Sequence, residues 1–124
     1  MLVNIGVTSI AVGALSGFVL AISSEKPRLL TRFGVVNRAP IRQVHLDWII
    51  MGGILTAIGV ALPDLSDVAV ILIASGGIVN PLLFVPGIFS RTFDYTLLMR
   101  IISIASYILL SLGLLLAGVA AWSL

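Results

Sequence analysis

Five polar or ionisable side chains lie inside or at the borders of long apolar runs, namely His45, Asp47, Asn80, Arg100 and Tyr107. Polar groups in a bilayer are costly, so each is expected to have a partner or a function. The chain has no cysteine, which excludes disulfides, thiolate zinc sites, covalent c-type haem attachment and cysteine nucleophiles. His45 is the only histidine and is therefore the leading candidate for a cofactor ligand.

His45 lies about one turn into the second apolar run, and small side chains follow it along the helix. The residues that continue its face are Trp48, Ile49, Gly52, Gly53 and Thr56. Two interpretations stay open. The small residues could let a neighbouring helix approach closely, or His45 could be the axial ligand of a haem lying along Gly52 and Gly53. A single histidine leaves the other axial position free, which suits Lewis-acid chemistry better than electron transfer.

Asn80 and Tyr107 are the candidate catalytic residues. Asn80 lies near the middle of the third apolar run and precedes Pro81, which predicts a kink because proline lacks a backbone donor. The depths of Asn80 and Tyr107 agree to within about two turns, so the two side chains could meet. Ser103 and Ser111 share the face of Tyr107. This polar stripe predicts either interhelical hydrogen bonds or the lining of a substrate pocket.

Two further features favour pairing and packing over chemistry. Asp47 projects to a different face from His45, and we expect it to pair with a cation such as Arg42 or Arg100. Gly13 and Gly17 form a GxxxG pair in the first apolar run, which is typical of close helix packing.

The elements that position these residues are membrane helices. The chain has 124 residues, of which 60% are hydrophobic and 10% charged, and its mean hydropathy is +1.23. This composition excludes a soluble globular surface and gives no support to nucleic-acid binding. We predict one all-α domain, an integral membrane four-helix bundle over residues 1–124. Runs long enough to span a bilayer cover residues 3–22, 44–62, 68–88 and 97–121.

The connections predict the topology. Residues 63–67 read Pro-Asp-Leu-Ser-Asp, a tight turn in which proline ends one helix and serine or aspartate caps the next. All seven Lys and Arg residues lie in or beside loops 23–43 and 89–96. By the positive-inside rule these loops are cytoplasmic, and both termini lie on the opposite side of what we expect to be a bacterial inner membrane. Trp122 at one boundary, with Trp48 and Tyr95 near the other, fits an aromatic belt.

The chain resembles a family of small membrane isomerases. The matching residues are Leu15-Ser16-Gly17-Phe18, His45-Leu46-Asp47, Met51-Gly52 and Asn80. They resemble the group typified by hydroxylaminobenzene mutase and styrene oxide isomerase, in which a histidine at the start of the second helix is followed six and seven residues later by Asn-Gly. The size, the four spans and an asparagine in the third helix agree with that group over most of the chain.

The resemblance implies an oligomeric haem b protein, with a trimer favoured. In such a protein ferric iron, held by one histidine, acts as a Lewis acid on a small apolar epoxide-like or aromatic substrate, with no net redox change. His45 would be the axial ligand and Asn80 a pocket residue. Met51 replaces the family's second-helix asparagine and cannot donate a hydrogen bond, which puts the substrate and the reaction in doubt.

Two other functions compete with this one. A small multidrug-type transporter also has four spans, but it depends on a carboxylate in the first span, and the run 3–22 has neither Asp nor Glu. A non-catalytic small subunit or assembly factor of a membrane complex stays open, because packing glycines and an interfacial histidine and aspartate would serve it equally well.

Overall fold

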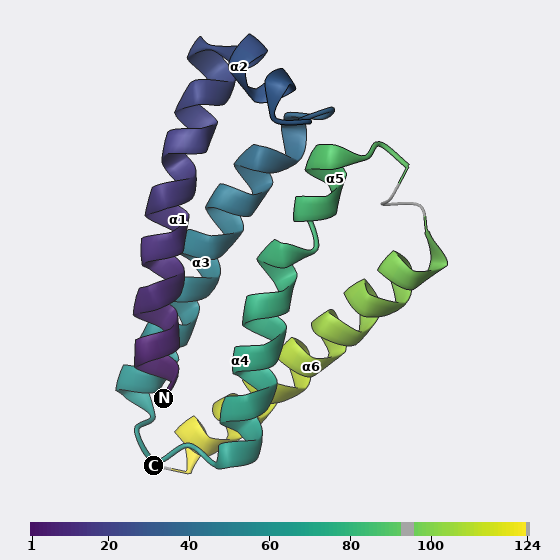
Figure 1. Ribbon diagram of the computed structural model, residues 1–124. Helices are drawn as coiled ribbons and strands as arrows, with labels where there is room; N and C mark the ends of the chain where they lie inside the picture. Colours follow the sequence, from purple (N-terminus) through teal and green to yellow (C-terminus); the bar gives the residue numbers. More distant parts are fainter. Residues whose placement is uncertain (93–95, 124) are drawn as a thin grey trace.

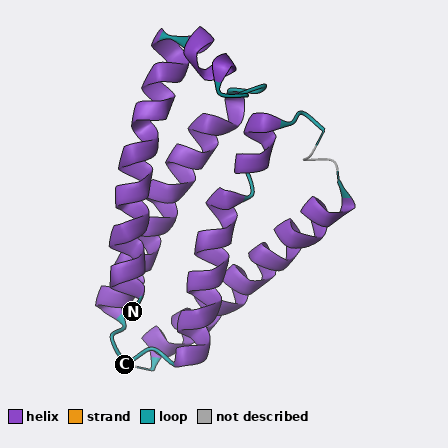
Figure 2. Ribbon diagram, viewed as in Figure 1, coloured by secondary structure: helices purple, strands orange, loops and turns teal. Residues whose placement is uncertain are grey.

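The computed structural model describes residues 1–92 and 96–123, and the regular structure in these ranges is entirely helical (Figure 2). The helices are α1 (Leu2–Glu25), α2 (Pro27–Arg32), α3 (Ala39–Ala61), α4 (Asp67–Leu82), α5 (Val85–Phe89) and α6 (Leu97–Trp122). Four segments are long and apolar enough to cross a membrane: α1, α3, α4 continued by α5, and α6. The predicted all-α fold with four membrane-spanning segments is confirmed.

The second span begins earlier than predicted. α3 starts at Ala39, whereas the apolar run was expected to start at residue 44. Pro40 falls in the first turn of α3, where the missing N–H would have had no intrahelical partner anyway. The loop between the first two spans is correspondingly shorter than predicted, and it contains the short helix α2.

The third span is interrupted. α4 ends at Leu82, and α5 begins at Val85 after a short break. Pro81 lies in the last turn of α4, and Pro86 lies in the first turn of α5. Proline removes a donor and crowds the carbonyl four residues earlier, so the helix cannot continue unchanged through this segment. The kink predicted at Asn80-Pro81 is confirmed.

The turn between α3 and α4 follows the prediction. α3 ends at Ala61, ahead of Pro63, and Ser66 is the N-cap of α4. The Ser66 hydroxyl accepts a hydrogen bond from the backbone N–H of Ala69 at 3.4 Å, which satisfies one of the free donors of the first turn. These local signals make α3 and α4 an antiparallel hairpin (Figure 1).

The four spans pack as two close pairs, α1 with α3 and α4 with α6, and the pairs meet mainly between α3 and α4. In Figure 1 the N-terminal end of α6 lies farther from α1 and α3 than its C-terminal end does. Glycines form the close contacts. A Cβ on Gly6 would lie 2.7 Å from the carbonyl oxygen of Gly52, and a Cβ on Gly76 would lie 2.8 Å from the backbone nitrogen of Leu110. Small residues at membrane helix contacts allow this approach.

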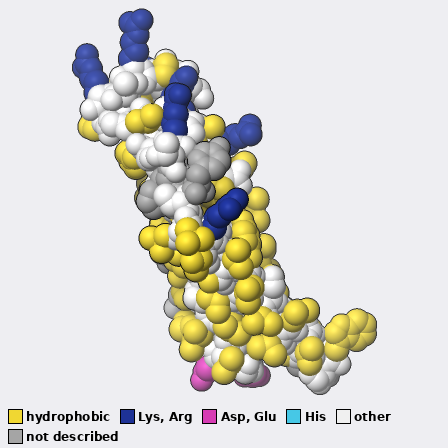
Figure 3. Space-filling model, turned by 90° about the vertical axis from the view of Figure 1, so that its right-hand side faces the viewer, with side chains coloured by type: hydrophobic (Ala, Val, Ile, Leu, Met, Phe, Trp, Pro, Cys, Tyr) yellow, Lys and Arg dark blue, Asp and Glu magenta, His cyan; other side chains and the backbone are white. Residues whose placement is uncertain are grey.

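Charge is distributed unevenly along the molecule. Lys and Arg side chains gather at one end, and acidic side chains show at the other (Figure 3). Between them the surface is mostly apolar, as a lipid-facing surface requires. Trp122 is 94% exposed at the end of α6, in agreement with the expected aromatic anchor, whereas Tyr95 lies outside the described residues.

Candidate functional site

His45 projects from α3 toward α1. Its Nδ1 lies 2.8 Å from the carbonyl oxygen of Gly13 and 3.2 Å from the hydroxyl of Ser16. A carbonyl can only accept, so Nδ1 carries the hydrogen, and the Ser16 hydroxyl donates to the same carbonyl at 2.6 Å. This hydrogen-bond geometry assigns the tautomer. In the neutral ring the lone pair is then on Nε2, the atom available to a metal or a proton.

Gly17 allows the imidazole to lie against α1. A Cβ at this position would lie 3.1 Å from Cε1 of His45 and 3.9 Å from Nε2. Gly13 has a different neighbour, because its Cβ would lie 3.1 Å from the backbone nitrogen of Ile49. The GxxxG pair therefore packs the helices, as predicted. It also positions His45, because the Gly13 carbonyl accepts a hydrogen bond from the ring and Gly17 has no side chain that would collide with it.

The two glycines predicted to line a haem do not share a surface. A Cβ on Gly52 would lie 2.7 Å from the carbonyl oxygen of Gly6 and 2.8 Å from the backbone nitrogen of Ile10. Gly53 has no heavy atom within 4 Å of an added Cβ. The face below His45 is therefore filled by α1 at Gly52. Of the two interpretations of this face, close helix packing is the one seen at Gly52, and no flat surface for a planar ligand is left there. Consecutive helix positions are about 100° apart, so Gly53 points away from that contact.

Asp47 and Asn80 form a buried polar contact between α3 and α4. Asp47 is 8% exposed and Asn80 is 6% exposed. The Asn80 Nδ2 donates to Oδ2 of Asp47 at 3.2 Å, and the Gln43 Nε2 donates to Oδ1 at 3.1 Å. The expected pairing of Asp47 with Arg42 or Arg100 is wrong, because the carboxylate faces α4 and its hydrogen bonds come from two amides. The Oδ1 of Asn80 is buried and has no hydrogen-bond partner among residues 1–92 and 96–123.

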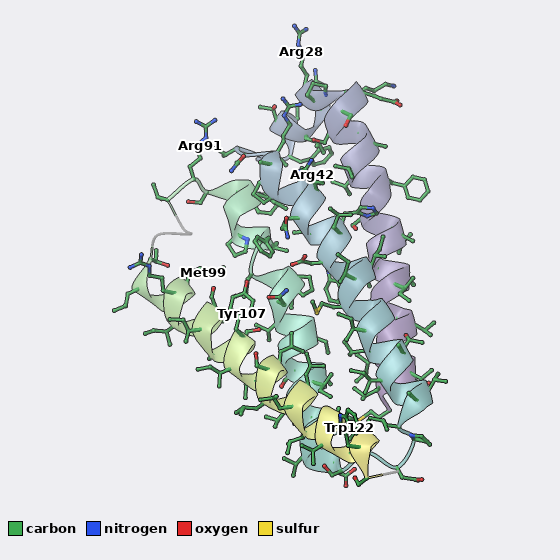
Figure 4. The ribbon with its side chains drawn as sticks, turned by 180° about the vertical axis from the view of Figure 1, so that it is seen from behind. Arg28, Arg42, Arg91, Met99, Tyr107 and Trp122 are labelled. Atoms are coloured by element: carbon green, nitrogen blue, oxygen red, sulfur yellow. The ribbon has the colours of Figure 1, made fainter. Side chains whose placement is uncertain are left out.

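Tyr107 does not meet Asn80, although their depths in the membrane would have allowed it. Its side chain is 51% exposed. It lies on α6 beside the break between α4 and α5, where it lines a groove of about 250 Å³ (Figure 4). The lining residues are Leu83, Phe84, Met99, Ser103 and Tyr107. Depth alone could not place Tyr107, because it does not fix the rotation of α6 about its own axis.

Ser106 is a buried polar residue of α6 that faces α4, and it was not among the predicted site residues. It is 2% exposed, and its hydroxyl donates to the carbonyl oxygen of Gly76 at 3.2 Å. The available signal was its spacing, since Met99, Ser106 and Gly113 recur every seven residues and all three are buried. The stripe through Tyr107 lies on a different face.

A second groove opens between α1, α3 and α4, with a volume of about 330 Å³. Its lining residues are Asn4, Ile5, Thr8, Ser9, Val12, Trp48 and Ile78. The hydroxyls of Thr8 and Ser9 donate to backbone carbonyls of their own helix, so the groove presents an almost wholly apolar lining. Trp48 was expected to be an interfacial anchor, but it forms one wall of this groove, one turn deeper than His45.

The candidate residues thus occupy three separate places in the fold. His45 lies between α1 and α3, Asn80 lies between α3 and α4, and Tyr107 lies at the margin of the contact between α4 and α6. In the described ranges no group of three or more His, Cys, Asp or Glu side chains gathers as a metal site would require. Comparisons with protein-family models, with curated proteins and with solved structures gave no match to this chain.

Proposed function

We propose that this chain is the subunit of a membrane-embedded, haem-dependent isomerase that rearranges small apolar epoxide-like or aromatic molecules with no net redox change. The supporting observation is the contact between Nδ1 of His45 and the carbonyl oxygen of Gly13. Metal-ligating histidines almost always donate their other ring N–H to a carbonyl, a carboxylate or water, which fixes the tautomer and the ring orientation. The resemblance of the sequence to small membrane isomerases supports the same ligand independently.

The donor chemistry of the chain would suit a haem held by a single histidine. Nε2 of His45 carries the free lone pair, and Gly13 and Ser16 hold the ring from the other side. Gly52 and Gly53 are not part of this proposal. Gly52 is covered by α1, and Gly53 points away from the contact between α1 and α3. His45 is therefore the one residue that we assign to holding the group.

Ferric haem, when bound, supplies a Lewis acid, which is why the chain needs no other strong electrophile. The chain itself contributes binding and exclusion of water. The groove beside Trp48 is apolar and has the size expected of a small-molecule site, so it suits a substrate that partitions into the membrane. Asn80 offers an acceptor oxygen that no group in the described part of the chain uses.

The first test is the visible absorption spectrum of the purified protein in detergent, before and after titration with hemin. We expect the wild type to show a Soret band and the His45→Ala variant to lose it, because no second histidine can replace the ligand. A Strep-type affinity tag is needed, since a polyhistidine tag would supply competing imidazoles. Adding free imidazole to the His45→Ala protein should restore part of the band.

A wild-type protein that stays colourless after hemin addition would falsify the haem proposal. A Soret band that persists in His45→Ala would instead reject His45 as the ligand. The matched control is Ile50→Ala, a change at an exposed position of the same helix that makes no polar contact, which should leave the spectrum unchanged.

We also propose the orientation in which the Lys- and Arg-rich end is cytoplasmic and the protein lies in a bacterial inner membrane. The absence of native cysteine makes single-cysteine labelling unambiguous. Asp64→Cys, in the turn between α3 and α4, should react with an impermeant maleimide in intact cells. Arg28→Cys should react only after the membrane is permeabilised. The reverse pattern would invert the proposed topology.

A second candidate function is a non-catalytic subunit of a membrane complex. The observation that favours it is the large apolar surface of α6, which packs chiefly against α4 alone. The two candidates separate in the hemin titration, because only the isomerase requires a haem that depends on His45.

A further inference from the structure

The short helix α2 directly follows the first span. α1 has 24 residues and is therefore about 36 Å long, which exceeds the hydrocarbon thickness of a bilayer, about 30 Å. Only Lys26 separates α1 from α2, and in Figure 1 α2 lies just beyond the end of α1. This places α2 at the level of the lipid headgroups.

α2 presents a basic pair and an apolar pair of side chains on neighbouring sides. Arg28 and Arg32 are four residues apart and share one side of the helix. Leu29 and Phe33 have the same spacing and share a side about 100° away. Leu29 is 39% exposed and Phe33 is 71% exposed, whereas Leu30 is buried. We call the four outward residues, Arg28, Leu29, Arg32 and Phe33, the α2 surface.

The basic side chains of the α2 surface are unpaired. Within residues 1–92 and 96–123, neither Arg28 nor Arg32 has a side-chain hydrogen bond or an ion pair. Segment 23–43 contains five Lys and Arg residues and one acidic residue, Glu25. The segment therefore does not neutralise its own charge at the end where Lys and Arg side chains gather in Figure 3, and a ligand with negative charge is favoured there.

The loop after α2 holds this surface in one position. Gly34 has a φ of +82°, a left-handed conformation that glycine adopts without strain. The N–H groups of Val36 and Asn37 both donate to the carbonyl oxygen of Ile88 in α5, at 2.9 and 3.0 Å. The chain thus turns back directly after Phe33 and is fastened to the third span.

We infer that the α2 surface binds the headgroup of an anionic phospholipid, with the arginines on the phosphate and the apolar pair among the upper acyl carbons. Arginine binds phosphate oxygens through charge-assisted, often paired, hydrogen bonds. Helices with a basic and an apolar side lie in the plane of the membrane interface. Free phosphate would satisfy the arginines but would leave Leu29 and Phe33 in water. The inference requires α2 to lie at a membrane surface, and it does not depend on haem or on the isomerase proposal.

The test is lipid binding to the whole chain in a neutral detergent, measured by native mass spectrometry. We expect phosphatidylglycerol to bind at least about tenfold more tightly than phosphatidylcholine. Arg28→Gln/Arg32→Gln should weaken phosphatidylglycerol binding about 30-fold, since each basic residue near an anionic lipid surface contributes roughly a factor of five. The matched control is Arg91→Gln/Arg100→Gln, which removes the same charge from a different connection and should leave the binding unchanged. Figure 4 shows Arg91 well apart from Arg28.

A second measurement reports on the apolar pair. The chain has no native cysteine, so a nitroxide can be attached to Phe33→Cys or to Thr31→Cys, on the opposite side of α2. In bilayers the label at position 33 should collide more often with oxygen than with a water-soluble nickel complex, and the label at position 31 should show the opposite preference. Equal affinity for the two lipids, an equal loss in both double variants, or a water-exposed label at position 33 would overturn the inference. Displacement of phosphatidylglycerol by glycerol 3-phosphate at a similar concentration would do so as well, because the site would then bind phosphate alone.

Discussion

Replacing Gly52 by alanine should lower the thermal stability of the protein, whereas the same change at Gly53 should leave it unchanged or raise it slightly. The new Cβ at position 52 would lie 2.7 Å from the Gly6 carbonyl oxygen and 2.8 Å from the Ile10 backbone nitrogen. Neither atom can move without shifting α1. Overpacking of this kind costs on the order of 1–3 kcal/mol, or a fall of roughly 5–15 °C in Tm.

Gly53 is the matched control, because it is the next residue on the same helix and has open space around it. Alanine there gains up to about 1 kcal/mol in helix propensity. The measurement is thermal unfolding in detergent, followed by the fluorescence of the two tryptophans. Similar changes in Tm for both variants would mean that α1 and α3 are not in this close contact.

The same two variants test the proposed haem site. If the glycines formed a cradle for a planar group, both substitutions would reduce haem retention. The structure leads us to expect a reduction for Gly52→Ala alone, since forcing α1 away from α3 moves the Gly13 carbonyl away from Nδ1 of His45. Haem retention is measured as the Soret absorbance per protein after gel filtration.

Features determined by local sequence could be predicted. The four spans follow from runs of about 20 apolar residues, the kink follows from Pro81, and the turn into α4 follows from Pro63 and Ser66. The spans, the kink and the turn each depend on residues close together in the sequence. Proline and the capping serine act directly on the hydrogen bonding of the neighbouring backbone, so no distant contact is needed to predict their effect.

The rotation of each helix about its axis could not be predicted. An amphipathic soluble helix reveals its buried face, but a membrane helix is apolar all round, so its pattern does not distinguish lipid from protein. For this reason a contact of Tyr107 with Asn80 and a ligand against Gly52 both stayed open. It is also why the partner of Asp47 was expected to be an arginine and proved to be Asn80.

The contact between Asp47 and Asn80 should behave as a strongly coupled pair in a double-mutant cycle. Asn80→Leu leaves the buried Oδ2 of Asp47 without its donor, and Asp47→Leu leaves the Asn80 amide without its acceptor. Each single change should cost about 1–3 kcal/mol of stability. The double variant should recover most of that loss, because both partners of the buried contact become apolar and the one amide left without its acceptor, that of Gln43, belongs to an exposed residue. Thermal unfolding of the four proteins measures the coupling.

The double variant also separates a structural role from a functional one. Asn80 keeps its Oδ1 buried and unpaired, although buried polar atoms in native structures are normally satisfied. If the proposed isomerase function holds and Asn80 contacts the substrate, the Asp47→Leu/Asn80→Leu protein should be stable and keep its Soret band. It should then lose activity on a small aryl epoxide by on the order of 10²-fold, the effect typical of losing one well-placed polar contact at a reacting centre. Full activity in this stable double variant would show that Asp47 and Asn80 only stabilise the packing of α3 against α4. The polar contacts to the substrate would then have to come from elsewhere, and the groove lined by Tyr107 would be the next candidate.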